Sequence, residues 1–292
     1  MPHVSAAFRA IPMVPLVLAA IVILSASAHA SALEALFAPK AKLWDRWTAH
    51  DPASTETIDH SDWDRFLAAY LAPDRSGVNR VAYGRVTQAD RQALDAYIDR
   101  LAALPISTYS RPEQYAYWFN LYNALTVQVI LDHYPVASIR DIDISPGLFA
   151  DGPWRKSLLR IEGERVSLDD IEHRILRPIW QDPRIHYGVN CAAVGCPDLQ
   201  PSAFTADNVD AMLDAAARDY VNDPRGWYMK GDRIVVSSIY IWFKPDFGSS
   251  DADVIEHLKQ YSTPERAAEL ANVKGIADSD YDWSLNDDAS SS

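Results

Sequence analysis

Residues 112–134 constrain the fold of this chain more than any other stretch. At 100° per residue, their apolar side chains surround a helix axis on every side: Tyr115, Trp118, Phe119, Leu121, Leu125, Val127, Val129, Ile130 and Leu131. A helix that is apolar on all sides must be buried on all sides. The sequence therefore predicts a central buried helix at about 112–134, around which the other elements pack.

Two asparagines lie inside this apolar segment and need partners. Asn120 and Asn123 are three residues apart, so they share one face of the predicted helix. A buried amide without a hydrogen-bond partner costs ~1–3 kcal/mol. The pair is expected either to bridge to the backbone of a neighbouring loop or to orient a catalytic group.

Short strands and further helices are expected around the central helix. Residues 158–166 and 227–237 each have the pattern of a hairpin, with a tight turn at a Glu-Gly or a Gly-Asp dipeptide. Capping boxes at 87–90 and 167–170 begin two helices. No internal repeat is visible. These features predict a single α+β domain with short, hairpin-connected antiparallel strands and surrounding helices.

The first 30 residues have the three-part pattern of a secretory signal peptide. An apolar run from Ile11 to Leu24 follows a short segment with one cation, Arg9, and precedes the small residues of Ser25–Ala30. The run is shorter than the ~20 residues that a membrane-spanning helix needs. We therefore expect an exported protein, periplasmic or extracellular after cleavage, with membrane contact only through an uncleaved leader.

The remaining chain divides into three parts and is strongly acidic. We expect a helical extension at 31–59, the α+β domain at 60–275, and a polar, acidic, disordered tail at 276–292. The formal net charge is −13, and loss of Arg9 with the leader makes it −14. Such a charge repels nucleic acid, so nucleic acid is not an expected partner.

Both cysteines of the chain lie in the stretch from Asp182 to Asp198. The content of 184–189 in β-branched and aromatic residues predicts a short strand that runs into a turn with the cysteines. The four residues between Cys191 and Cys196 are small and flexible enough to allow a disulfide. The alternative is that Cys191 is a nucleophile, which requires a base to activate its thiol.

The helix predicted to begin at 167 places a carboxylate toward the core. Glu172 falls within the apolar arc of this helix, and His173 lies at its flank. A buried carboxylate must be paired, protonated or metal-bound, because an isolated buried charge is too costly. We expect either a structural ion pair with an arginine such as Arg177 or Arg184, or a role in a site.

Strand geometry decides which histidine is the candidate base. If 186–190 is extended, five steps of ~3.3 Å separate His186 from Cys191 by about 16 Å. His173 is then the better base, with Glu172, Asn120 or Asn123 to orient it.

Four blocks of the sequence resemble one known family. They are 117–126 (YWFNLYNALT), 167–177 (SLDDIEHRILR), 182–197 (DPRIHYGVNCAAVGCP) and 238–247 (SIYIWFKPDF). Together they resemble the domain-of-unknown-function 547 family over about residues 60–260. The resemblance implies no particular reaction, but it implies that a set of polar positions recurs: Asn120, Asn123, Glu172, His173, His186, Asn190, Cys191 and Cys196.

These residues predict a polar cluster with three alternative functions. The leading hypothesis is a thiol-dependent hydrolase or transferase without a cofactor, in which a papain- or transglutaminase-like Cys/His/Asn set acts on a peptide or amide. Its expected catalytic residues are Cys191, His173, Glu172, Asn120 and Asn123.

Supporting or binding residues around this cluster are expected to be His186, Asn190, Arg184 and Trp118. The first alternative is a non-enzymatic binding or scaffolding domain with a structural Cys191–Cys196 disulfide. The second is a metal site formed by Glu172, His173 and His186. The expected partner is a small molecule or a peptide.

Overall fold

A long helix at the centre of the molecule organises the fold. The computed structural model describes residues 38–147 and 152–288, and in it helix α4 spans Arg111–His133. Every residue of α4 from Glu113 to Val127 is buried. The central helix predicted from the all-round apolar pattern is therefore confirmed, with its ends shifted by one residue.

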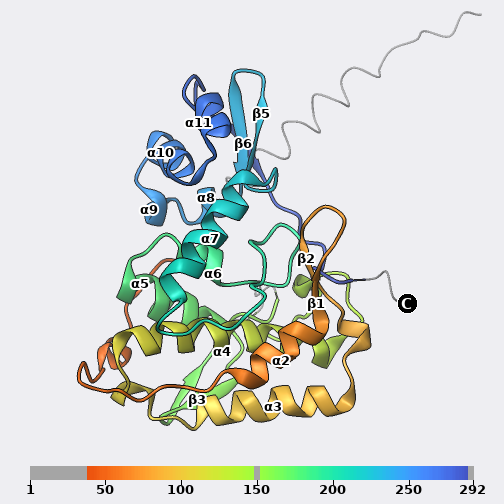
Figure 1. Ribbon diagram of the computed structural model, residues 1–292, viewed down its shortest axis with the longest axis vertical. Helices are drawn as coiled ribbons and strands as arrows, with labels where there is room; N and C mark the ends of the chain where they lie inside the picture. Colours follow the sequence, from red (N-terminus) through yellow and green to blue (C-terminus); the bar gives the residue numbers. More distant parts are fainter. Residues whose placement is uncertain (1–37, 148–151, 289–292) are drawn as a thin grey trace, which may run out of the picture.

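The first of two cores packs around α4 (Figure 1). Helices α2 (Ser61–Tyr70) and α3 (Gln88–Ala102) cover one side of α4, and the π-helix η5 (Asp170–Leu176) continues as α5 (Arg177–Trp180) along another. Two small antiparallel hairpins border this core. They are β1 (Leu71–Pro73) with β2 (Asn79–Val81), and β3 (Leu159–Ile161) with β4 (Glu164–Val166). Single 3₁₀ turns occur at η2 (Tyr83–Arg85), η3 (Ile106–Thr108) and η4 (Ile139–Asp141).

The second core lies at the other end of α7 (Val209–Asn222), which extends from the first core into it (Figure 1). A three-stranded sheet in the order β5-β6-β7 forms one side. Strand β6 (Arg233–Ser237) pairs antiparallel with β5 (Trp227–Lys230) and parallel with β7 (Ile276–Asp280). Four helices complete it: α8 (Ile239–Trp242), α9 (Lys244–Phe247), α10 (Asp251–Tyr261) and α11 (Pro264–Leu270). The chain thus forms the predicted α+β domain. Within 38–147 and 152–288, no helix has the length and apolarity to cross a membrane.

The predicted strand at 184–189 is wrong, because Ile185–Gly188 form a helical turn, α6. Asp182 and Pro183 begin this turn: the Asp182 side chain accepts the Arg184 amide, and its carbonyl accepts the Ile185 amide. The apolar content of this stretch reflects burial between the two cores rather than strand formation. At Gly188 the approach is so close that a Cβ would lie 2.5 Å from the Phe119 ring.

The expected helical extension at 31–59 is also wrong for its described part. Residues 38–59 contain one 3₁₀ turn, η1 (Asp45–Thr48), and are otherwise irregular. The amides of Lys42 and Trp44 donate to carbonyls of the η5 helix, and Trp47 packs edge-on against Trp118 at 5.2 Å. The segment is therefore fixed by pairing with η5. The leader at 1–30 and residues 31–37 lie outside the described residues.

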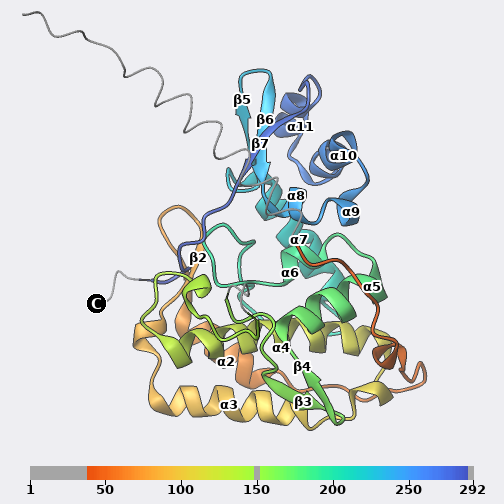
Figure 2. The same ribbon diagram turned by 180° about the vertical axis from the view of Figure 1, so that it is seen from behind.

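The acidic end of the chain is ordered from 276 to 288, so the expected disordered tail is wrong there. After β7, this segment runs down past β2 (Figure 2). Leu285 and Asn286 are buried, and bridges join Leu285 to Ala193 and Asp287 to Val81. The apolar residues of this segment alternate with carboxylates, of which Asp280 and Asp282 are exposed, and this polar content hid the pattern. Residues 289–292 lie outside the described part.

Candidate functional site

The loop that carries both cysteines is held by hydrogen bonds to its own backbone. The Asn190 side chain accepts the Ala192 amide at 2.9 Å and donates to the Pro197 carbonyl at 2.8 Å, which ties both ends of the loop together. Ala192 has φ of +59°, a left-handed conformation that is costly for a residue with a Cβ. The segment 282–286 pairs with the loop from outside through the amides of Val194, Gly195 and Asn286.

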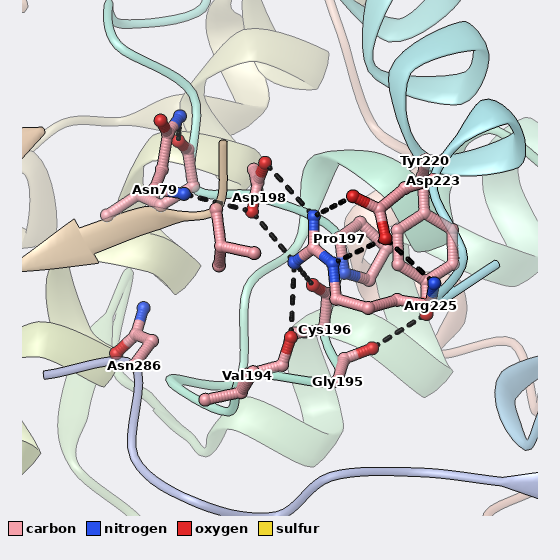
Figure 3. Close-up of polar contacts among 12 residues, drawn as sticks. Asn79, Val194, Gly195, Cys196, Pro197, Asp198, Tyr220, Asp223, Arg225 and Asn286 are labelled. Carbon is pink, nitrogen blue, oxygen red and sulfur yellow. Dashed lines mark hydrogen bonds and ion pairs between the residues drawn. The ribbon is translucent and has the colours of Figure 1, made fainter. Parts of the chain in front are cut away.

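A half-buried arginine holds another side of the same loop (Figure 3). Arg225 donates to the carbonyls of Val194 and Cys196 at 3.1 and 3.2 Å, and forms an ion pair with Asp198 at 3.0 Å. Partial burial lowers the pKa of Arg225, but the carboxylates of Asp198 and Asp223, which accept hydrogen bonds from it, raise its pKa above the usual value. The Tyr220 hydroxyl donates to the Gly195 carbonyl at 2.7 Å. The carbonyls of three successive residues, Val194, Gly195 and Cys196, are therefore all held by hydrogen bonds.

The two thiols meet inside this loop. The Sγ atoms of Cys191 and Cys196 lie 3.1 Å apart, the Cys191 amide donates to Cys196 Sγ, and the Tyr281 hydroxyl lies 3.0 Å from Cys191 Sγ. Both cysteines are free. The expected Cys191–Cys196 disulfide is therefore not formed, because a disulfide requires ~2.05 Å between the sulfurs. The predicted proximity of the two side chains is nevertheless present.

The surroundings make the two thiols unequal. Cys191 is half-buried and Cys196 is buried. Hydrogen bonds to its sulfur from Cys196, Tyr281 and the Ala193 amide lower the pKa of Cys191. Burial, together with the neighbouring Cys191 sulfur, raises the pKa of Cys196 well above its usual value. Cys191 is therefore the thiol that ionises first.

A second polar cluster surrounds Glu172, which is buried. Its Oε2 accepts from the Tyr122 hydroxyl at 3.1 Å. Its Oε1 lies 3.7 Å from Nδ1 of His173 and 3.7 Å from Nδ1 of His186. Burial raises the pKa of Glu172 to about 7, although Arg177 opposes the rise. This carboxyl is therefore poised to bind or release a proton near neutral pH.

His186 is oriented by a carboxylate that sequence reasoning did not single out. Its Nε2 lies 2.7 Å from Oδ2 of Asp246 on α9, and its ring stacks on Phe243 with centroids 4.6 Å apart. Against the cost of burial, hydrogen bonds from His186 and Arg177 lower the pKa of Asp246. Phe243 and Asp246 both lie in the 238–247 block, but nothing in the local sequence of that block indicates that they contact His186, which lies 60 residues before Asp246.

Arg177 completes the cluster, and its contacts disfavour the predicted role of His173 as the base for Cys191. It donates from Nε to Asp246 at 2.5 Å and from Nη1 to Nδ1 of His173 at 2.9 Å. Burial, and then the Arg177 charge, lower the pKa of His173 well below its usual value. A histidine whose Nδ1 is already an acceptor for a guanidinium is a poor base for Cys191. Within the described ranges, neither His173 nor His186 has a hydrogen bond to Cys191.

The metal alternative concerns Glu172, His173 and His186. Among the residues placed by the structure, no group of three or more His, Cys, Asp or Glu side chains is arranged to hold a metal ion. Arg177 also donates a hydrogen bond to Nδ1 of His173, so this nitrogen is not free to bind a metal. The metal alternative is therefore not supported.

Asn120 and Asn123 bridge to loop backbone, the first of the two roles considered for them. Asn120 donates to the Phe204 carbonyl at 2.7 Å and accepts the Phe204 amide at 2.9 Å. Asn123 donates to the Gly188 carbonyl and accepts the Asn190 amide, each at 2.9 Å. Among the described residues, the hydrogen bonds of both amides go to loop backbone, and none goes to a candidate catalytic side chain. Asn123 instead fixes the start of the cysteine loop.

Two further predicted residues lie away from the thiols and from Glu172. Arg184 forms ion pairs with Asp182, Asp210 and Asp214, so it is Arg177 that accompanies Glu172. Trp118 is a core residue, packed edge-on against Trp47. Their expected supporting roles at the site are wrong.

An open cavity of about 770 Å³ borders the opposite side of Arg225 and Asp198. Its lining includes Asn79 on the β1–β2 hairpin, Arg218 near the end of α7 and Tyr261 at the end of α10. The space thus lies between the two cores and is separated from Cys191 by the cysteine loop.

The two clusters are close enough to influence one another electrically. The charge on Glu172 opposes ionisation of the thiol and so raises the pKa of Cys191, against the hydrogen bonds that lower it. Tyr122, whose hydroxyl binds Glu172, has a pKa raised by burial and then by Glu172 and both sulfurs. The site therefore combines a half-buried thiol with a lowered pKa, a buried thiol with a raised pKa and a buried carboxyl with a raised pKa.

Comparison with known proteins gives one match. A family described as "Protein of unknown function, DUF547" matches residues 106–221. This stretch begins just before α4 and ends within α7, so it contains both cysteines, Glu172, His173 and His186 but not Asp246, Arg225 or Tyr281. No curated protein and no solved structure matches.

Proposed function

By its residues 106–221 the chain belongs to the DUF547 family, and we propose that it carries out thiol–disulfide exchange, with Cys191 as the attacking thiol and Cys196 as the resolving thiol. One observation carries this proposal. Two free sulfurs lie 3.1 Å apart, and the half-buried one has the lowered pKa while the buried one has the raised pKa. This asymmetry suits exchange, in which one thiolate attacks and a second thiol resolves the intermediate.

The exchange proceeds in two steps that balance. The Cys191 thiolate attacks one sulfur of a substrate disulfide, forms a mixed disulfide and releases the other substrate sulfur as a thiolate. The Cys196 thiol then gives its proton to the thiolate already released, and the resulting Cys196 thiolate attacks Cys191 Sγ, which forms the Cys191–Cys196 disulfide and releases the second substrate sulfur as a thiolate. The substrate gains two electrons and the protein loses two. A dithiol substrate reverses both steps.

The rigid loop supports this chemistry because the sulfurs need little movement to bond. The carbonyls of Val194, Gly195 and Cys196 are fixed by Arg225 and Tyr220. To bond, the sulfurs need to approach by about 1 Å, from 3.1 Å to the ~2.05 Å of a disulfide. The expected substrate is a small molecule or peptide that carries an accessible disulfide or thiol pair.

Trapping of the mixed disulfide tests the proposal. Cys196→Ser treated with oxidised glutathione is expected to gain one glutathione on Cys191, detected by intact mass and peptide mapping. The wild type is expected to lose two hydrogens and retain no adduct, and Cys191→Ser to gain no adduct at Cys196. Absence of the adduct in folded Cys196→Ser, or two free thiols in wild type after excess oxidant, overturns the proposal. A purely structural disulfide would instead resist mild reductant.

A thiol-dependent hydrolase or transferase acting on an amide is the second candidate. Its support is the lowered pKa of Cys191 next to the titratable Glu172. Acyl transfer needs Cys191 but not Cys196. Turnover of a peptide amide that survives in Cys196→Ser and vanishes in Cys191→Ser would favour this candidate over exchange.

The compartment of this chemistry is proposed from the leader pattern at 1–30. Export would place the dithiol where disulfides form and persist. Fractionation of cells that express the full chain is expected to recover a cleaved product outside the cytoplasm. Recovery of the uncleaved chain in the cytoplasm would contradict this placement.

A further inference from the structure

Among the residues that the structure describes, Tyr122 donates to Oε2 of Glu172 and no residue donates to its Oε1. Asp246 accepts from His186 Nε2, so in the neutral ring Nδ1 of His186 carries no proton. Arg177 donates to Nδ1 of His173, so that nitrogen is also an acceptor. Oε1 of Glu172 therefore faces two unprotonated nitrogens, each 3.7 Å away.

A proton on this oxygen resolves the arrangement. If Glu172 were ionised, a buried negative charge would point at two lone pairs, which is costly in a site of low polarity. With one added proton, the Glu172 hydroxyl donates to His186 Nδ1, or the protonated Nδ1 donates to Glu172. A small rotation of the Glu172 side chain brings the two atoms from 3.7 Å to hydrogen-bond length.

The charges that face Glu172 come from every element packed against it. Its own helix contributes Asp169, His173 and Arg177, and α4, α6 and α9 contribute Tyr122, His186 and Asp246. Arg177 and Asp246 neutralise each other at 2.5 Å. Burial raises the pKa of Asp169 to about 6. The proton between Glu172 and His186 thus decides whether this cluster carries an additional negative charge.

We propose that Glu172 and His186 share one proton that keeps the space beside Cys191 uncharged, so that both act as positioning residues for the reactive thiolate. The inference deepens the proposed function, because it concerns how Cys191 is kept reactive in exchange. Loss of the shared proton places a carboxylate charge on Glu172, and this charge opposes the thiolate of Cys191. The thiol is then most reactive while the buried pair is protonated.

Glu172→Gln tests the proposal because its amide imitates the protonated carboxyl. The amide NH₂ can donate to His186 Nδ1, and the amide oxygen can accept from Tyr122, so the variant is expected to fold. The rate of Cys191 alkylation by iodoacetamide is measured from pH 5 to 9. In Glu172→Gln the alkylation rate is expected to rise at a lower pH than in the wild type, and the inflection that the wild type shows near pH 7 is expected to be absent. At neutral pH alkylation is expected to be roughly threefold faster.

A matched control and a second measurement isolate the role of Glu172. Glu113 is also buried and accepts a hydrogen bond from the Ile58 amide. Among the described residues, it has no hydrogen bond to either thiol or to Glu172. Glu113→Gln is therefore expected to leave the alkylation profile unchanged, whereas Glu172→Asp is expected to restore the inflection. In carbon NMR, the Glu172 carboxyl is expected to titrate near pH 7.

The results that overturn this inference differ from those that overturn exchange. Superimposable alkylation profiles for wild type and folded Glu172→Gln, or a Glu172 carboxyl that titrates near 4.5, reject the shared proton. Neither measurement involves Cys196 or a substrate disulfide. The trapping experiment on Cys196→Ser therefore decides the exchange reaction separately.

Discussion

The cysteine loop and the Glu172 cluster are both polar and largely buried, but they are built in opposite ways. The loop is a single segment whose shape is set by backbone hydrogen bonds to Asn190, Arg225 and the segment 282–286. The cluster is assembled from side chains of η5, α4, α6 and α9, between aromatic rings. The hydrogen bonds of the loop thus determine where the two sulfurs lie, whereas the side chains of the cluster determine whether Glu172 is protonated.

This difference predicts two kinds of failure. Damage to the loop should loosen the thiols at any pH, because its hydrogen bonds involve backbone groups that do not titrate. Damage to the cluster should change how stability or reactivity depends on pH. The four predictions below test this distinction.

The largest effect is expected from Glu172→Gln on the pH dependence of stability. Because the pKa of folded Glu172 is raised from 4.5 to about 7, its contribution is present below 4.5 and is lost as pH rises toward 7. The interval corresponds to about 3 kcal/mol. Urea unfolding of wild type is expected to show this loss and the variant to lack it. The exposed Glu164→Gln should behave as wild type, and a slope retained in Glu172→Gln would contradict the prediction.

Arg225→Met is expected to give the next largest effect, by breaking the loop. The variant loses ion pairs with Asp198 and Asp223 and two carbonyl contacts. These carboxylates remain partly exposed, so we expect a loss of about 2–3 kcal/mol in the free energy of unfolding. Arg218→Met, on the exposed face of the helix α7 that precedes Arg225, should cost under about 0.5 kcal/mol. Equal losses for both variants would show that Arg225 is not a special support.

Asn123→Ala and Asn120→Ala form a matched pair on one helix face. Each removes two hydrogen bonds to buried backbone, and each should cost about 2 kcal/mol. Only Asn123 contacts the start of the cysteine loop, through Gly188 and Asn190. Asn123→Ala is therefore expected to alter the rate of Cys191 alkylation and Asn120→Ala to leave it unchanged. The same change in both rates would indicate a general loosening of the core.

Tyr281→Phe is expected to have the smallest effect. It removes the hydroxyl 3.0 Å from Cys191 Sγ, and with it one of the hydrogen bonds that lower the pKa of Cys191. Alkylation at neutral pH should slow roughly threefold, with little change in stability. Tyr228→Phe, whose hydroxyl binds Asp280 on the surface, is the control. An unchanged rate in Tyr281→Phe would remove Tyr281 from the site.

The sequence predicted what depends on local periodicity. The central helix follows from apolar residues on all its sides, and its paired asparagines follow from the cost of burying an amide. The burial of Glu172 was visible for the same reason, because the carboxylate falls within an apolar arc. These predictions use only residues that are within a few turns of one another.

Contacts between distant segments could not be predicted in this way. Asp246 and Tyr281 reach the site from 60 and 90 residues beyond their partners His186 and Cys191. The wrong strand at 184–189 has a related cause, because burial between two cores demands apolar residues whatever the backbone does. Once α6 is helical, the argument from strand length that separated His186 from the site no longer applies.

The segment after β7 has a consequence for the order in which the protein matures. Tyr281 and the residues 282–286 that pair with the cysteine loop are synthesised about 90 residues after that loop. A nascent chain therefore presents its thiols before the cover that tunes them exists. Without residues 281–286, Cys191 would lack the Tyr281 hydroxyl and the loop would lack the hydrogen bonds on its outer side, so the surroundings of both thiols are complete only once this segment has been made.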